Sequence, residues 1–204
     1  MREPRLRPEE RAHIVAPAME KDLSAAGGVR MISLLEYQGR VTAIYLVADE
    51  RGDVYPVLAL SREAAELKEA VDKLDREPSE KAMDAVIGEA GDLLWHVAAL
   101  CREFSWSMGG LAPTNVFPCS LVVAANSIQV VVGRVAEITK RVVIDKNGVF
   151  SAEDKHKIRD ALARVVHLVA VIALSLGTSL NQVMVVSLAK LESRRVLGGS
   201  GDGL

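Results

Sequence analysis

Apolar residues recur at steps of three and four positions along most of the chain, which places them on one face of a helix. The pattern is clearest in a segment with seven apolar residues at such steps: Met83, Val86, Ile87, Ala90, Leu94, Val97 and Leu100. Gly, Pro and Ser residues separate the periodic segments and mark their ends. We therefore predict helices over residues 13–23, 31–47, 61–74, 80–104, 121–143, 152–176 and 178–195.

Capping residues define several of these helix ends. Ser61 and Thr178 are expected to be N-caps, whose side-chain oxygens accept hydrogen bonds from the first turn. The sequence SAED at residues 151–154 resembles a capping box. The sequence DKNG at residues 145–148 predicts a turn before it, and Gly177 is expected to end the helix that follows.

One segment leaves two structures open. The apolar residues between Ile32 and Tyr45 are loosely spaced as on a helix. Residues 41–47 and 54–60, on either side of the sequence ERGD, are also compatible with the two strands of a β-hairpin. We favour the helix.

The best internal boundary is residues 105–120, which contain two glycines and two prolines. A shift of the chain by 71 residues aligns three pairs of polar residues: Glu66 with Glu137, Glu89 with Asp160, and His96 with His167. The alignment suggests a duplicated two-helix unit. We expect an N-terminal extension (1–30), a first unit (31–118) and a second unit (119–204) that ends in a Gly-rich tail.

Composition fits packed helices and excludes some classes of protein. Half of the 204 residues are hydrophobic but only 4% are aromatic, so the core is expected to consist of Ala, Val, Leu and Ile. The 27 acidic and 25 basic residues give a net charge of −2. This balance argues against a strongly basic nucleic-acid binder.

Cellular location and assembly are predicted from the same numbers. Cys101 and Cys119 are too few for a disulfide framework, and no apolar run reaches the roughly 18 to 20 residues of a membrane span. The charged residues 1–11 precede no apolar stretch, so no secretory signal is predicted. We expect a cytoplasmic protein with no nucleic-acid or membrane partner, whose excess apolar surface is buried in a homodimer.

Two predicted helices each carry a pair of acidic residues three positions apart. These are Glu63 and Glu66 on the first helix, and Glu89 and Asp92 on the second. Residues three apart share one helix face, and the short connection at residues 75–79 makes the two helices antiparallel neighbours. Carboxylates that converge in this way suit a hard cation, Mg²⁺ or Mn²⁺.

A second interpretation of these acids stays open. Residues 61–75 are also compatible with an ordinary solvated face, in which acids and bases pair one turn apart. Glu89 and Asp92 lie among apolar residues, where a carboxylate is costly unless it is paired or bound to a metal. His96, one turn beyond Asp92, is expected to be a hydrogen-bonded buried histidine and not a ligand.

The acidic residues resemble those of a known family. Glu63-Ala-Ala-Glu66, followed after 22 residues by Glu89-Ala-Gly-Asp92, is similar to the ExxE…ExxD signature of the MazG-type all-α nucleoside triphosphate pyrophosphohydrolases. Residues 37–45 (YQGRVTAIY) resemble the first helix of that family. Residues 180–203 resemble its last helix and its tail rich in Gly and Asp.

The resemblance implies an all-α, MazG-like helical bundle, in which the repeat suggests a duplicated four-helix unit. It also implies Mg²⁺-dependent hydrolysis of a nucleoside triphosphate to a nucleoside monophosphate and pyrophosphate, with Mn²⁺ as a substitute metal. The implied metal ligands are Glu63, Glu66, Glu89 and Asp92. Glu63 or Glu66 is the implied general base for the attacking water.

The chain departs from the family pattern at several acidic positions. Arg62 stands where the family often has a further Glu. In the second unit, Arg134 and Ala163 stand at the positions of Glu63 and Asp92. We therefore expect the second unit to be degenerate and to have lost its metal site.

The substrate pocket is expected to combine both units. The Asn-x-x-Lys element of the family's last helix is Ser187-Leu-Ala-Lys190 here, and Asn115 is its equivalent in the first unit. Lys190 or Arg194 is expected to offset the charge of the phosphates, and Trp95 is a candidate for stacking on the base. The alternative function is a catalytically inactive MazG-like protein that binds nucleotides or serves in assembly.

Overall fold

All regular structure in the described part of the chain is helical. The computed structural model describes residues 31–44 and 54–198, with side chains described as far as Ser193. Its helices are α2 (Leu34–Ile44), α3 (Val54–Arg76), α4 (Glu80–Glu103), the short 3₁₀ helix η2 (Met108–Leu111), α5 (Leu121–Asp145), α6 (Ala152–Ser175) and α7 (Leu180–Gly198). The all-α prediction is confirmed. The helix predicted at residues 13–23 lies outside the described residues.

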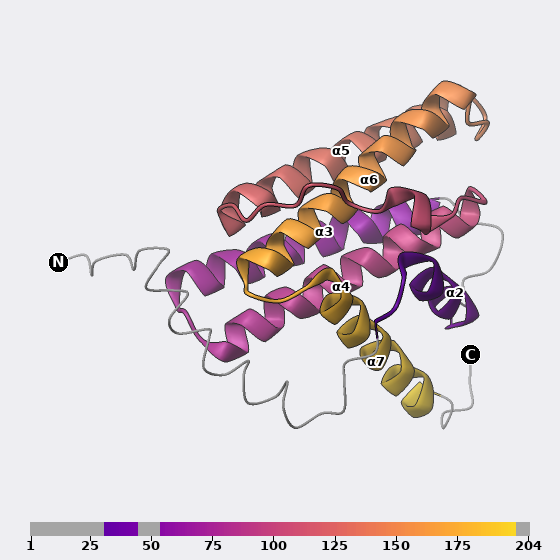
Figure 1. Ribbon diagram of the computed structural model, residues 1–204. Helices are drawn as coiled ribbons and strands as arrows, with labels where there is room; N and C mark the ends of the chain where they lie inside the picture. Colours follow the sequence, from indigo (N-terminus) through magenta and orange to yellow (C-terminus); the bar gives the residue numbers. More distant parts are fainter. Residues whose placement is uncertain (1–30, 45–53, 199–204) are drawn as a thin grey trace.

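The long helices form two antiparallel hairpins that pack against each other. α3 pairs with α4, α5 pairs with α6, and α3 lies along α5 (Figure 1). The shorter helix α2 and the last helix α7 both pack on α4. One cluster of buried apolar side chains runs through all of these helices. The duplication of a four-helix unit and the three-part division of the chain stay predictions.

Helix α3 begins at Val54, about two turns earlier than the sequence predicts. Residues 54–60 are helical, so the hairpin alternative is wrong for this segment. Pro56 lies in the first turn, where its missing N–H would have no partner within the helix. Ser61 is therefore inside the helix and not its N-cap. Its hydroxyl donates instead to the carbonyl oxygen of Val57, at 3.0 Å.

Capping residues fix the starts of the central helices, and one of the three predicted caps is confirmed. Ser79 is the N-cap of α4, because its Oγ accepts a hydrogen bond from the N–H of Ala82. Ser151 and Asp154 form the predicted capping box of α6. The prediction of Thr178 as an N-cap is wrong by one residue, since Ser179 Oγ accepts the bond from the N–H of Gln182 at 3.2 Å.

Helix α5 is the most apolar of the described helices. By length and composition it could cross a membrane, with a mean hydropathy of 1.5, and α6 and α7 would do so only as a pair bent by 101°. In the fold, α5 packs along α3 and α6 and buries nine of its residues. This packing accounts for much of its apolar character.

Candidate metal centre

Three of the four predicted acidic residues converge between α3 and α4. Glu63 comes from the middle of α3, and Glu89 and Asp92 come from one face of α4. One carboxylate oxygen from each lies within 4.8 Å of the other two. Because the two helices are antiparallel, their acidic faces meet at the same height in the hairpin.

Two of the three carboxylates are buried, and Glu89 is half-buried. The Glu63 side chain is only 2% exposed and that of Asp92 only 12%. Glu63 Oε2 and Glu89 Oε2 are buried without a hydrogen-bond partner in the described part of the chain. A buried carboxylate oxygen that lacks a partner is costly, so these two atoms are suited to a cation or a polar ligand.

The pKa values of the two glutamates are shifted in opposite directions. Burial alone raises the pKa of Glu63, but the neighbouring His96 and the charge of Arg62 outweigh it, so the net pKa is lowered. Burial raises the pKa of Glu89, and Lys190 counteracts this only in part because Asp92, Glu66 and Glu63 add to the rise. The site therefore contains more negative charge than its own basic residues offset.

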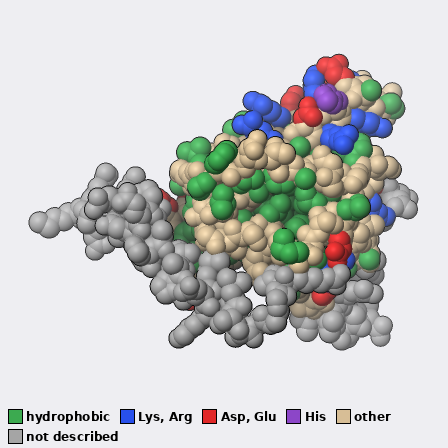
Figure 2. All heavy atoms as spheres, in the orientation of Figure 1, with side chains coloured by type: hydrophobic (Ala, Val, Ile, Leu, Met, Phe, Trp, Pro, Cys, Tyr) green, Lys and Arg blue, Asp and Glu red, His purple; other side chains and the backbone are tan. Residues whose placement is uncertain are grey.

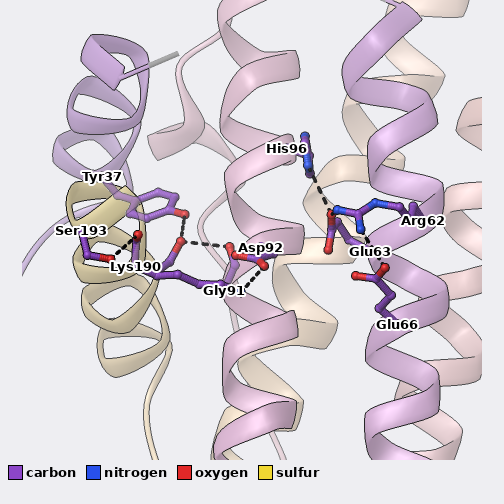
Figure 3. A network of polar contacts seen from close by, with 10 residues as sticks. Tyr37, Arg62, Glu63, Glu66, Gly91, Asp92, His96, Lys190 and Ser193 are labelled. Carbon is purple, nitrogen blue, oxygen red and sulfur yellow. Dashed lines mark hydrogen bonds and ion pairs between the residues drawn. The ribbon is translucent and has the colours of Figure 1, made fainter. Parts of the chain in front are cut away.

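Arg62 holds two acids of α3 together. Its guanidinium donates to Glu63 Oε1 and, at 2.7 Å, to Glu66 Oε1 (Figure 3). The Glu66 side chain is 39% exposed. It is not part of the group of three that converges. Arg62 itself is 65% exposed and sits at the rim of the site.

His96 lies beside Glu63 on the buried side of the site. Its Nε2 is 3.7 Å from Glu63 Oε1, and its side chain is 2% exposed. Its other ring nitrogen, Nδ1, has no hydrogen-bond partner among the described residues. The ring of Trp95 lies edge-on to His96, with centroids 4.2 Å apart. Trp95 is half-buried against the core, one residue before His96 on α4.

Helix α7 brings a basic residue from the far end of the chain. Lys190 Nζ donates to Asp92 Oδ2, across 98 positions of sequence (Figure 3). The expected pairing of acids from the first unit with Lys190 of the second therefore exists as a direct contact. Asn115 lies in the loop before α5, exposed and with a φ of 51°. Arg194 lies in α7, but its side chain is outside the described part.

A second polar contact fixes α7 on α4, and sequence analysis missed it. Tyr37 Oη and Ser187 Oγ are 2.8 Å apart, and the Ser187 hydroxyl also donates to the carbonyl oxygen of Gly91 at 3.1 Å. A Cβ at Gly91 would lie 3.0 Å from that of Ser187. A glycine within the apolar periodic segment of α4 was the available signal for this close approach. The contact holds Lys190 in reach of Asp92.

Comparisons of the chain with protein-family models, with curated proteins and with solved structures give no match. The similarity to the MazG type therefore rests on the residues of this chain alone. Chemically, the arrangement offers a group of oxygen ligands for a hard cation with one primary amine at its edge.

Proposed function

We propose that this protein is a Mg²⁺-dependent nucleoside triphosphate pyrophosphohydrolase that releases a nucleoside monophosphate and pyrophosphate. The observation that supports the proposal is the group formed by Glu63, Glu89 and Asp92, with two buried carboxylate oxygens that lack partners. Lys190 beside Asp92 adds a positive charge of the kind that phosphate binding requires.

The residues fit a hard divalent cation. All three converging side chains offer oxygen, the ligand type that Mg²⁺ and Mn²⁺ prefer. Glu63, Glu89 and Asp92 would hold the ion, and Glu66, which is bonded to Arg62, lies outside this group. A bound Mg²⁺ would neutralise phosphate charge and lower the pKa of a water molecule.

The roles of the two predicted bases follow from their exposure. Both acids are bonded to Arg62, but the Glu63 side chain is only 2% exposed, whereas that of Glu66 on the adjacent turn is 39% exposed. We assign Glu66 as the general base, because water and substrate reach it without displacing the core. In this scheme water attacks a phosphorus atom, Glu66 accepts its proton, and pyrophosphate leaves.

The charge of the phosphates would be offset at the opposite edge of the site. Lys190 is bonded to Asp92, and its side chain is 33% exposed. A phosphate oxygen could therefore replace or share the carboxylate as its partner. Because Lys190 comes from α7, the pocket would close only when the last helix is packed on α4.

The second candidate is an inactive MazG-like protein that binds nucleotides or serves in assembly. Arg62 favours it, since this guanidinium binds both Glu63 and Glu66 and supplies the positive charge that a metal would supply. In that case Arg62→Ala would create metal affinity that the wild-type chain lacks. If the first proposal is right, wild type already binds the metal. The homodimer and the cytoplasmic location stay predictions.

Pyrophosphate release tests the proposed activity. Purified protein would be incubated with a panel of ordinary and damaged nucleoside triphosphates, with Mg²⁺ or with EDTA. We expect release from at least one substrate in Mg²⁺ only, and a loss of at least about 100-fold in Glu89→Gln. Asp84→Asn is the matched control, because Asp84 is an exposed acid on the same helix. Tight nucleotide binding without release from any substrate would favour the inactive alternative.

A further inference from the structure

A shallow groove of about 570 Å³ lies on the second hairpin, between α5 and α6. Its volume is within the range of small-molecule sites. Four basic and two acidic side chains line it, together with apolar residues: Arg134, Glu137 and Arg141 from α5, and Lys157, Asp160 and Arg164 from α6. In the surface view, Lys and Arg side chains gather on this end of the molecule together with Asp, Glu and His side chains (Figure 2).

The acids of the groove already have partners on their own helices. Glu137 Oε2 is 2.6 Å from Lys140 Nζ, and Glu137 Oε1 is 3.9 Å from Arg141 Nε. Asp160 Oδ2 is 3.3 Å from His156 Nε2, one turn earlier on α6. Lys157 is also paired on its own helix, with its Nζ 2.5 Å from Glu153 Oε1. The two carboxylates of the groove are therefore poorly placed to neutralise Arg134 and Arg164.

Two arginines on opposite walls have no polar partner. Arg134 on α5 and Arg164 on α6 make no hydrogen bond or ion pair with any residue of the described chain. Both are exposed, so their guanidinium groups are available to a ligand. A guanidinium binds phosphate through two parallel hydrogen bonds, which makes arginine the usual residue for this anion.

The alignment of the chain with itself at an offset of 71 residues lets the groove be compared with the first hairpin. It sets Arg134 on Glu63, Lys157 on Val86 and Arg164 on Leu93. The first hairpin therefore has an acid or an apolar residue where the second has a base. The acids are kept at this offset, since Glu137 aligns with Glu66 and Asp160 with Glu89, so the additional bases are what distinguish the second face from the first.

We infer that the α5–α6 groove is a binding site for the phosphate groups of a small phosphorylated molecule, with Arg134 and Arg164 as its anchors. The two anchors approach the ligand from different helices, which fits a diphosphate better than a single phosphate. The apolar residues of the floor, Val131, Ile138 and Ala161, leave room for an uncharged part of the ligand. The inference does not depend on the proposed hydrolase activity.

The test is binding of inorganic pyrophosphate to the full chain by calorimetry, in EDTA and at low salt. EDTA keeps metal out of the acidic site, whose carboxylates then repel pyrophosphate. We expect binding that weakens as salt is added, and a loss of about tenfold for each of Arg134→Ala and Arg164→Ala. The matched control is Lys73→Ala/Arg76→Ala, which removes two exposed bases from α3 and is expected to change affinity by less than about twofold.

Further measurements separate the possible ligands and the two sites. The affinity for ADP would be compared with that for pyrophosphate. Equal or weaker binding of ADP would indicate that the site recognises the phosphates alone, and tighter binding would indicate a further contact with the nucleoside. Glu89→Gln is expected to bind pyrophosphate with wild-type affinity. This expectation holds whether or not the same substitution lowers hydrolysis, so the two proposals can fail separately. The inference is overturned if wild type does not bind pyrophosphate, if the Arg134→Ala/Arg164→Ala variant binds it as wild type does, or if only single-stranded nucleic acid binds. Circular dichroism would check that each variant is folded.

Discussion

The close contact between α4 and α7 gives a prediction that depends on one methyl group. In Gly91→Ala the new Cβ would lie 3.0 Å from Ser187 Cβ and 3.4 Å from Ser187 Cα. Ordinary carbon contacts are about 3.5 to 4.0 Å, so α7 would have to move by roughly 0.5 Å. Gly88 lies three residues earlier on α4, and a Cβ there would meet nothing within 4 Å. The two glycines are therefore a matched pair.

The magnitudes follow from two opposing effects. Alanine in place of a helical glycine stabilises by about 1 kcal/mol, and this gain applies to both positions. Overpacking in a tight interface costs about 1 to 3 kcal/mol, and this cost applies only to Gly91→Ala. We expect Gly88→Ala to raise the free energy of unfolding by about 1 kcal/mol. Gly91→Ala should be less stable than Gly88→Ala by about 1 to 3 kcal/mol.

Urea denaturation followed by circular dichroism would measure both variants against wild type. A second readout is pyrophosphate release, which should fall in Gly91→Ala because the shift of α7 draws Lys190 away from Asp92. Gly88→Ala should keep wild-type activity. Equal stabilisation by the two substitutions would refute the close packing of α7 on α4, and with it the contribution of α7 to the site.

Three further predictions concern other parts of the fold. Burial raises the pKa of the Cys101 thiol to about 12. Iodoacetamide at pH 8 should therefore alkylate the exposed Cys119 and leave Cys101 unmodified until the protein unfolds, and mass spectrometry would locate the modified residue. Ser151→Ala removes the side-chain cap of α6 and should cost about 1 kcal/mol in urea denaturation. Bonds from Lys146 and Ser151 lower the pKa of Asp154, so the ionised side chain stabilises the fold fully above about pH 4 and this contribution is lost as the pH falls further. Asp154→Asn should therefore reduce the pH dependence of the free energy of unfolding in acid.

The sequence predicts the helices best where a cap and a periodic pattern agree. α4 and α6 follow Ser79 and Ser151, and their bounds differ from prediction by about one residue. The start of α3 was missed because residues 54–60 are a short apolar run, which does not by itself distinguish a strand from a buried helix. The helix forms because Val57 and Leu60 are buried in the core, a tertiary effect.

The candidate site also has a part that the sequence predicts and a part that it does not. The convergence of Glu63 with Glu89 and Asp92 could be predicted, because it needs only helix periodicity and one short turn. The bonds that Arg62 makes could not, since a flexible side chain has many possible partners on the same face. The network through Tyr37 joins residues about 150 positions apart, and only the packing of α7 on α4 brings them together.

Divalent-metal binding is the most direct test of the acidic site. Calorimetric titration of the metal-free full chain with Mn²⁺ would compare wild type with Glu89→Gln and Asp84→Asn. The account predicts a Mn²⁺ site in wild type and in Asp84→Asn that Glu89→Gln lacks. Absence of Mn²⁺ binding in wild type, or binding that survives unchanged in Glu89→Gln, would contradict it.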